Sequence, residues 1–142
     1  MENSILAPAA VLVLWTIVML VWLAVTRLPG MTKAGIDLKT APPGGRGIDL
    51  EPVLPAKINW ISHNYTHLHE QPTLFYAVVA ILAIAGHGNG INTSLAWGYV
   101  ILRIIHSLWQ ALVNVTSIRF ALFLLSTFCL LALAVNAVRA TI

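Results

Sequence analysis

Long uncharged stretches alternate with short polar segments along this chain of 142 residues. The first stretch runs from Asn3 to Thr26 without any Asp, Glu, Lys or Arg, which is long enough to cross about 30 Å of hydrocarbon. A second stretch, from Gln71 to Leu102, is too long for one simple span, and the turn-forming segment Gly86 to Gly90 interrupts it. The pattern therefore predicts two antiparallel helices on either side of that turn.

The predicted fold is all-α, an integral membrane four-helix bundle that occupies residues 1–142 as a single domain. We expect its helices at about residues 5–26, 56–85, 93–113 and 119–138. The segment between the first two helices carries most of the Pro and Gly residues, which is typical of an irregular loop. No internal repeat is apparent.

Composition supports this fold and excludes other classes of protein. Hydrophobic residues make up 58% of the chain and charged residues 9%, far from the composition of a soluble domain. The eight Lys and Arg residues are scattered and do not form a basic face with interleaved aromatic residues, so the sequence gives nucleic-acid binding no support. Cys129 is the only cysteine and cannot form a disulfide within the chain.

The distribution of basic residues predicts the orientation in the membrane. Cytoplasmic loops carry an excess of Lys and Arg. The first loop and the start of the second helix contain five such residues and the loop at residues 86–92 contains none. We therefore expect a multi-pass protein of the bacterial inner membrane, with its first loop in the cytoplasm and both termini on the opposite side; Arg139 is the one contrary charge. The N-terminus lacks the basic region of a signal peptide, so we expect its apolar segment to be retained.

Two predicted helices carry ionisable side chains, which are costly in lipid and need partners. On the second helix, the spacing of His63, His67 and Glu70 puts them on one face. On the third helix, Arg103 begins a polar stripe at offsets of three, four and seven residues, formed by Arg103, His106, Ser107 and Gln110. Glu70 is the only acid predicted inside the membrane, and it lies at an overlapping depth, so we expect it to pair with Arg103.

Arg119 stands at the start of the fourth predicted helix, where the helix dipole already favours anions. Together with Arg103 it could hold an anionic ligand or favour a thiolate over a thiol. The alternative interpretation is a charged residue that extends from the helix boundary toward water. A metal or haem site at His63, His67 and His106 is a further alternative, although no familiar ligand spacing is present.

At these residues the sequence resembles the MAPEG family, the membrane-associated proteins of eicosanoid and glutathione metabolism. Glu70 is followed by a proline and an apolar run, as in the family's second helix. The segment from Arg103 to Ser107 is similar to the Arg-x-x-His-Thr segment of the microsomal prostaglandin E synthases. Arg119 follows Arg103 at the sixteen-residue offset where those enzymes have a catalytic arginine.

The resemblance implies a homotrimer that binds glutathione between neighbouring protomers and takes a hydrophobic small-molecule substrate from the membrane lipids. Arg119 would be the catalytic residue and would stabilise the glutathione thiolate. The residues implied in binding glutathione are Glu70, Arg103, His106, His67 and Gln110. The chemistry implied is that of a glutathione-dependent transferase or peroxidase, with conjugation of an electrophile or reduction of a peroxide.

Three positions depart from the family pattern. His67 replaces an asparagine, Gln110 stands where glutathione-using members often have tyrosine, and Phe120 stands where some synthases have serine. These departures keep a second function open, a non-catalytic lipid-binding or accessory membrane subunit. A metal- or haem-binding membrane protein is the third.

Overall fold

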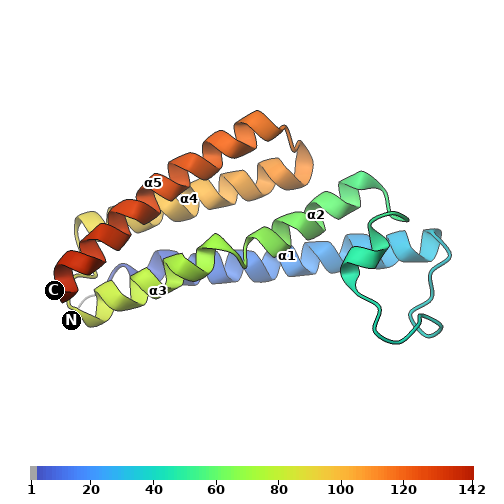
Figure 1. Cartoon of the computed structure of the whole chain (residues 1–142), viewed down its shortest axis with the longest axis horizontal. Coiled ribbons are helices and arrows are strands. Elements are labelled where there is room, and N and C mark those ends of the chain that lie inside the picture. Colours follow the sequence, from blue (N-terminus) through green and yellow to red (C-terminus); the bar gives the residue numbers. More distant parts are fainter. Residues whose placement is uncertain (1–2) are drawn as a thin grey trace.

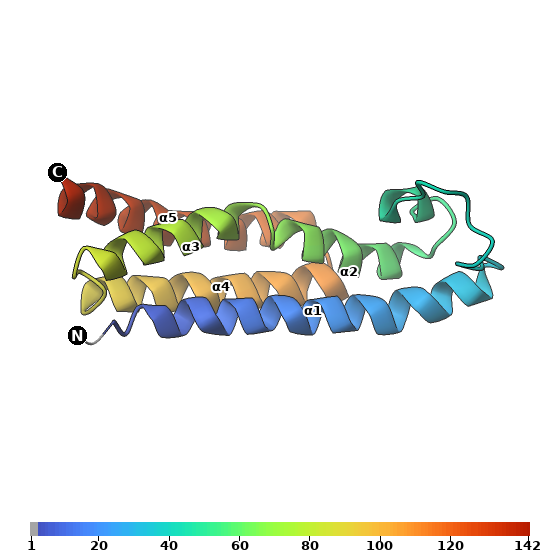
Figure 2. The same cartoon turned by 90° about the horizontal axis from the view of Figure 1, so that it is seen from below.

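The structure, a computed structural model, describes residues 3–142, and every regular element in that range is helical. The elements are α1 (Leu6–Lys33), the short 3-10 helix η1 (Gly47–Leu50), α2 (Ala56–His67), α3 (Gln71–Ile84), α4 (Ile91–Leu112) and α5 (Thr116–Thr141). α2 and α3 follow one another as a single interrupted rod, so the chain forms four rods (Figures 1 and 2). The prediction of an all-α four-helix bundle is confirmed.

The rods lie side by side with the two chain ends at the same end of the bundle (Figure 1). We call this the termini end and the opposite end, which carries residues 34–55, the loop end. α4 packs chiefly against α5, and α1 packs against α2 and α4. The connection between α4 and α5 stops short of the tips of α1 and α2, so those two helices project beyond the other pair at the loop end (Figure 1).

α1 continues to Lys33, beyond the end that the sequence predicted near Thr26. Its last turns bury Gly30 and Met31, which a charged, exposed loop would not do. A Cβ atom placed on Gly30 would lie 2.8 Å from Cδ1 of Ile58 in α2, so the missing side chain permits close helix contact. Packing against α2 therefore extends α1 past its first basic residue.

The second predicted helix is interrupted rather than continuous. α2 ends at His67 and α3 begins at Gln71, with Pro72 in its first turn. A proline inside a helix lacks the N–H donor and crowds the carbonyl four residues earlier, which here belongs to Leu68. Gln71 holds the break in place, since its Nε2 donates to Thr127 of α5 at 2.9 Å and its Oε1 accepts from the Tyr99 hydroxyl of α4 at 3.2 Å.

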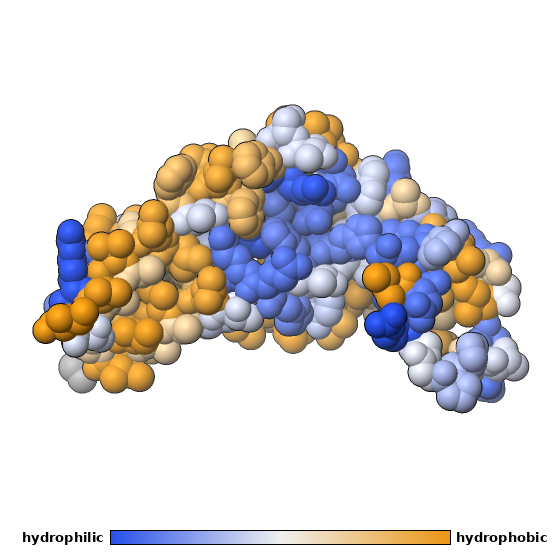
Figure 3. Space-filling view, in the orientation of Figure 1, coloured by the Kyte–Doolittle hydropathy of each residue, from blue (hydrophilic) through white to orange (hydrophobic). Residues whose placement is uncertain are grey.

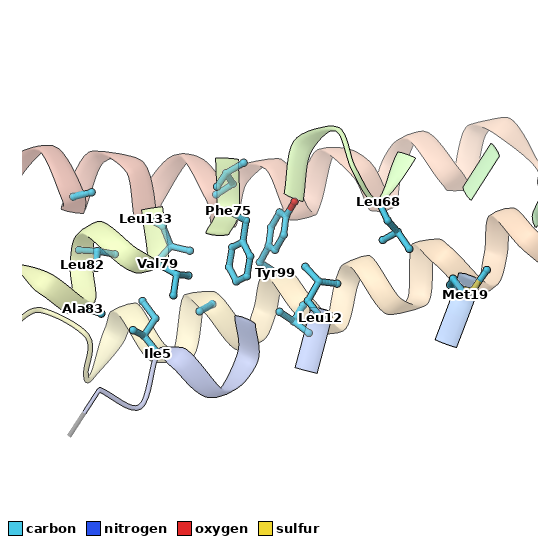
Figure 4. Close-up of a cluster of buried hydrophobic side chains, with 14 of the residues drawn as sticks. Ile5, Leu12, Met19, Leu68, Phe75, Val79, Leu82, Ala83, Tyr99 and Leu133 are labelled. Atoms are coloured by element: carbon cyan, nitrogen blue, oxygen red, sulfur yellow. The ribbon is translucent and has the colours of Figure 1, made fainter. Parts of the chain in front are cut away.

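A hydrophobic core runs along the middle of the bundle. The rings of Phe75 and Tyr99 stack with centroids 4.4 Å apart, and Leu12, Val79 and Leu133 lie among the fully or almost fully buried side chains around them (Figure 4). Outward-facing positions of α1 and α5 are also apolar. Within residues 3–142, α1 and α5 are the two helices long and apolar enough to cross a membrane by themselves. The polar stripe lowers the hydropathy of α4, and α2 and α3 are each too short alone.

The termini end is closed by hydrogen bonds between the first residues and the turn that joins α3 to α4. Ile5 donates its backbone N–H to the Gly88 carbonyl at 2.9 Å, and the Ser4 hydroxyl lies 2.7 Å from that of Thr93. Deeper in the same end, Nδ2 of Asn136 donates to Oδ1 of Asn92 at 2.7 Å. These hydrogen bonds connect the start of α1, the start of α4 and the end of α5, and they pair the polar groups named above.

Candidate functional site

The polar stripe of α4 faces the interior of the bundle. Arg103, His106, Ser107 and Gln110 are all buried, and Arg103 has no exposed surface. Their spacing places them on one face of the helix, and that face packs against α1 and α2. The stripe predicted from the sequence is therefore an internal feature of one protomer.

The predicted pair between Arg103 and Glu70 is not formed, which corrects that expectation. The Glu70 side chain is 63% exposed, and its Oε2 lies 3.4 Å from Nδ1 of His67. The cause is the interruption of the second rod, because Glu70 occupies the N-cap of α3 with φ −89° and ψ −96°, outside helical geometry. The expected depth of Glu70 assumed a continuous helix, whereas the break turns its side chain outward.

The Arg103 guanidinium is buried without any partner among the described residues. Its Nε and both Nη atoms make no hydrogen bond there. Buried polar atoms are nearly always paired, and leaving one unpaired costs about 1–3 kcal/mol, more for a charged group. Buried side-chain atoms without a partner also occur in five further residues, namely Arg27, Asn59, Asn64, His106 and Gln110.

Trp15 and Asn64 connect the stripe to α1 and α2, and the sequence did not indicate this role for either residue. The Ser107 hydroxyl accepts a hydrogen bond from Nε1 of Trp15 in α1 at 2.9 Å and another from Nδ2 of Asn64 in α2. Asn64 has no exposed surface. Its position one turn before His67 was the available signal, but nothing in the sequence distinguished it from an interfacial polar residue. These bonds fix the orientation of α4 against α1 and α2.

A cavity of ≈ 690 Å³ opens beside the stripe at the loop end. Gln110 and part of η1 line it together with charged or ionisable side chains, which are Arg27, Glu51, His63, Tyr65, His67, Glu70 and Arg119. Figure 3 shows hydrophilic side chains gathered over the middle and the loop end of one face, whereas the termini end of that face is mostly apolar. The cavity therefore has both cationic and anionic walls.

Two polar contacts shape the loop side of this cavity. Nη2 of Arg27 donates to the Ser62 hydroxyl at 2.7 Å, and Nε2 of His63 lies 2.6 Å from Oε1 of Glu51. The sequence interpretation had assigned both Arg27 and Glu51 to a connecting loop. In the sequence only their charge indicated a role at the site. Their contacts form because α1 extends past Arg27 and because the loop brings Glu51 back to His63.

Arg119 is half-buried at the start of α5 and is held in position. Its Nη1 donates to Oδ1 of Asn114 at 2.6 Å. Asn114 adopts a φ of +56°, a left-handed conformation that asparagine tolerates better than most residues. Arg119 lines the cavity instead of extending away from the bundle. Its geometry thus fits a role in holding an anion.

A smaller cavity of ≈ 180 Å³ adjoins the first turns of α5. Its walls include two residues of the larger cavity, His67 and Arg119, and four others, which are His106, Thr116, Phe120 and Phe123. The His67 ring lies with its centroid 5.0 Å from that of His106. His67 and Arg119 are therefore common to both cavities.

The histidines do not assemble into a metal site. Within residues 3–142, no group of three or more His, Cys, Asp or Glu side chains is arranged to hold a metal ion. His63 is engaged with Glu51, and His67 is engaged with Glu70. The alternative of a protein that holds a metal ion with three or more such side chains therefore has no ligand set in this part of the chain.

The fold and the site together define a helical-bundle membrane protein with a cavity near one end that is lined by charged side chains. The sequence profile of the MAPEG family matches residues 5–139, which is nearly the whole chain. The chain therefore belongs to the MAPEG family and is an integral membrane protein. No curated protein and no solved structure matches it. The resemblance to the family is confirmed, and the similarity to the prostaglandin E synthases within it stays a prediction.

Proposed function

We propose that this protein is a membrane-bound, glutathione-dependent transferase or peroxidase that acts on hydrophobic electrophiles. Membership of the MAPEG family is consistent with this activity. The observation that carries the proposal is the buried Arg103 guanidinium, which has no partner among the described residues and lies on the α4 stripe whose Gln110 lines the same cavity as Arg119. Buried cations in a membrane protein persist when an opposite charge compensates them, and here an anionic ligand is the proposed source.

The residues of the larger cavity suit the charges of glutathione, a tripeptide with two carboxylates, one ammonium group and a thiol. Arg27 and Arg119 provide cations for carboxylate or thiolate groups. Glu70 has an exposed carboxylate that can accept hydrogen bonds from the ammonium group. The volume of ≈ 690 Å³ lies within the range of about 300–1,000 Å³ found for small-molecule sites.

In the proposed mechanism Arg119 stabilises the thiolate. Its bond to Asn114 uses Nη1 and leaves the other N–H groups for the sulfur, where a fixed positive charge favours the ionised form. In a conjugation, the new C–S bond forms as the leaving group departs with its electron pair, and the thiol proton passes to water. In a peroxide reduction, one peroxide and two thiols give an alcohol, water and a disulfide.

The proposed assembly is a homotrimer in a bacterial inner membrane. The first loop would face the cytoplasm, which places the larger cavity toward the supply of glutathione. Both termini would lie on the opposite side, and their position at the same end of the bundle is consistent with this orientation (Figure 1). Hydrophobic substrates would reach the site from the membrane lipids.

Equilibrium dialysis of the detergent-purified protein against glutathione tests the proposal directly. We expect saturable binding at millimolar glutathione or below, and conjugation of glutathione to 1-chloro-2,4-dinitrobenzene. Arg119→Ala removes the proposed catalytic residue. Arg139→Ala is its matched control, because it removes an arginine side chain from the other end of α5. Absence of saturable binding at millimolar glutathione would overturn the proposal.

The second candidate function is a non-catalytic lipid-binding or accessory subunit. It is favoured by Phe120, whose side chain is 57% exposed beside Arg119, and by the engagement of His67 with Glu70. Turnover that disappears in Arg119→Ala would argue against this candidate. A partner that copurifies in stoichiometric amount, with no turnover of any electrophile tested, would support it.

A further inference from the structure

A groove separate from the proposed glutathione site lies at the loop end, between the last turns of α1 and the start of α2. Residues of α1 from Val25 onward form one wall, and Val53, Pro55 and Ile58 form the other. None of its lining residues lines the larger cavity. We propose that this groove binds an anionic phospholipid, with the phosphate at Lys33 and the glycerol and acyl chains along the apolar remainder. This inference goes beyond the proposed function and does not depend on it.

The groove is lined almost entirely by apolar side chains and contains a single charge. Among its lining residues only Lys33 is charged, and within residues 3–142 Lys33 takes part in no ion pair. Its ammonium group has three N–H donors and no acceptor, so it can bind a phosphate. Val25 lies eight residues before Lys33, which is about 12 Å along the axis of α1. The groove therefore has an apolar end and a cationic end, as an amphipathic anion requires.

The two ends of the groove lie at the depths where a phospholipid has its apolar and its charged parts. At 1.5 Å per residue, Val25 is about 28 Å and Lys33 about 40 Å from Leu6 along α1. A hydrocarbon core is about 30 Å thick, and the headgroup layers lie beyond it. When the start of α1 lies at one edge of this core, Val25 lies near the other edge and Lys33 lies among the headgroups. Lipid phosphates occur at the depth of Lys33 and acyl chains at the depth of Val25.

The surroundings of the groove favour an anionic lipid over other occupants. No residue of α3, α4 or α5 lines the groove, and α1 and α2 project beyond the other pair at this end, so the rest of the protomer leaves it open to lipid (Figure 1). Residues 27–57 include five basic and three acidic side chains, a net charge of +2. A positive segment beside a membrane attracts anionic headgroups, whereas phosphatidylcholine carries no net charge. An anionic phospholipid therefore matches both the groove and the charge around it.

Photolabelling with a lipid probe tests the site. The protein is reconstituted in phosphatidylcholine vesicles with a small fraction of phosphatidylglycerol that carries a diazirine close to its glycerol backbone, and labelled peptides are identified by mass spectrometry. We expect labelling to concentrate in residues 25–34 and 53–58. Unlabelled phosphatidylglycerol should compete about five times more effectively than phosphatidylcholine, the factor that one basic residue contributes near an anionic surface. Labelling spread evenly over the lipid-facing residues of α1 and α5, or equal competition by the two lipids, would overturn the inference.

Variants of the cationic end make the test specific. In Lys33→Ala the two lipids should compete equally, and in Lys33→Arg the preference for phosphatidylglycerol should remain. Lys39→Ala is the matched control, since it removes the same charged group from the neighbouring loop but does not alter the lining of the groove. An unchanged preference in Lys33→Ala would show that Lys33 serves only the end of its helix, and it would contradict the assignment.

Variants of the apolar end test the place of the acyl chains. Val25→Trp fills the groove and should reduce labelling of residues 25–34 and 53–58. Val21→Trp is the control, because Val21 lies one turn earlier on α1 and is 57% exposed, against 61% for Val25, but does not line the groove. An equal reduction in both variants, or none in Val25→Trp, would place the acyl chains elsewhere and overturn the inference.

Two further arms distinguish the lipid from other occupants of the groove. Soluble glycerol phosphate should not compete with the probe at millimolar concentration, and competition would show that a free phosphate binds there instead. A photoreactive benzoylphenylalanine in place of Val53 should cross-link to lipid. Cross-linking to a second protomer would show that another copy of the chain covers the groove, which would also overturn the inference.

Discussion

Buried polar groups are paired at the termini end of this bundle, whereas some of those in the middle and toward the loop end have no partner among the described residues. At the termini end, Asn92 and Asn136 are hydrogen-bonded to each other, and Ser4 is bonded to Thr93. In the middle of α4 the three guanidinium nitrogens of Arg103 have no partner among the described residues, and nearer the loop end the side-chain oxygen of Gln110 has none either. Both ends are built from helices of the same four rods, so the difference lies in the side chains and not in the fold.

On the proposed function, the contrast separates polar residues that hold the structure together from those that would bind a ligand. An unpaired buried group lowers stability, and on the proposed function a bound anionic ligand compensates for the unpaired guanidinium of Arg103. The paired groups of the termini end stabilise the ligand-free protein. Substitutions at the termini end should therefore lower stability and leave activity unchanged. Substitutions at the unpaired or ligand-binding residues should lower activity with little loss of stability.

The largest effect is expected for Arg119→Ala. Removing one donor that stabilises a developing or stored negative charge typically lowers the rate by about 10²–10³-fold. We expect a loss of this size in kcat/KM for glutathione conjugation, with little change in unfolding temperature. Arg139→Ala should stay within two-fold of the wild type, and an equal loss in both variants would refute the distinction between the ends.

Arg103→Leu should separate stability from function most clearly. Replacing even a buried ion pair by apolar residues of similar volume is often neutral or stabilising by about 1–4 kcal/mol, and an unpaired buried charge has no attraction to lose. We therefore expect the ligand-free variant to unfold at a higher temperature in detergent and to lose saturable glutathione binding. Ile101→Leu, on the exposed side of α4, is the control. A large loss of stability in Arg103→Leu would show that the chain itself compensates the guanidinium.

Asn136→Leu probes the opposite end. It leaves Oδ1 of the buried Asn92 without its hydrogen bond, which costs about 1–3 kcal/mol. We expect a lower unfolding temperature and unchanged kcat/KM once the protein is folded. Restoration of stability in the double variant Asn92→Leu, Asn136→Leu would attribute the cost to the unpaired group.

Gln110→Met should have the smallest effect on stability, within about 0.5 kcal/mol, because the Gln110 oxygen has no partner to lose. Gln110 lines the larger cavity, so we expect glutathione affinity to fall several-fold in dialysis. A variant that binds glutathione like the wild type would remove Gln110 from the proposed site.

The four spans and the α4 stripe could be predicted because both depend on periodicity and on long apolar runs, which are local properties of the chain. The end of α1 could not, since it depends on the contact of Gly30 with Ile58, which is remote in sequence. Pro72 indicated a bend in the second rod. The extent of the interruption depends on the hydrogen bonds of Gln71 to Tyr99 and Thr127, which are remote in sequence.

The sequence indicated several residues that line the cavities, but it did not indicate their contacts. Arg119, Glu70, His67 and Gln110 line the larger cavity, and His106 lines the smaller one. Arg103 lies buried away from both linings, and its expected partner faces outward. The error came from converting sequence distance into depth along a straight helix, which fails wherever a rod is interrupted.

Because the rods differ in length, the depth of Arg119 in the membrane depends on the thickness of the bilayer. α4 has 22 residues and α1 has 28, so they measure about 33 Å and 42 Å at 1.5 Å per residue. The shorter rod is about as long as a hydrocarbon layer is thick, and the longer one exceeds that thickness. Longer acyl chains would place Arg119 deeper below the water surface and shorter ones would lift it out. The lipid composition of the host membrane is thus a variable that sets how readily polar molecules reach this arginine.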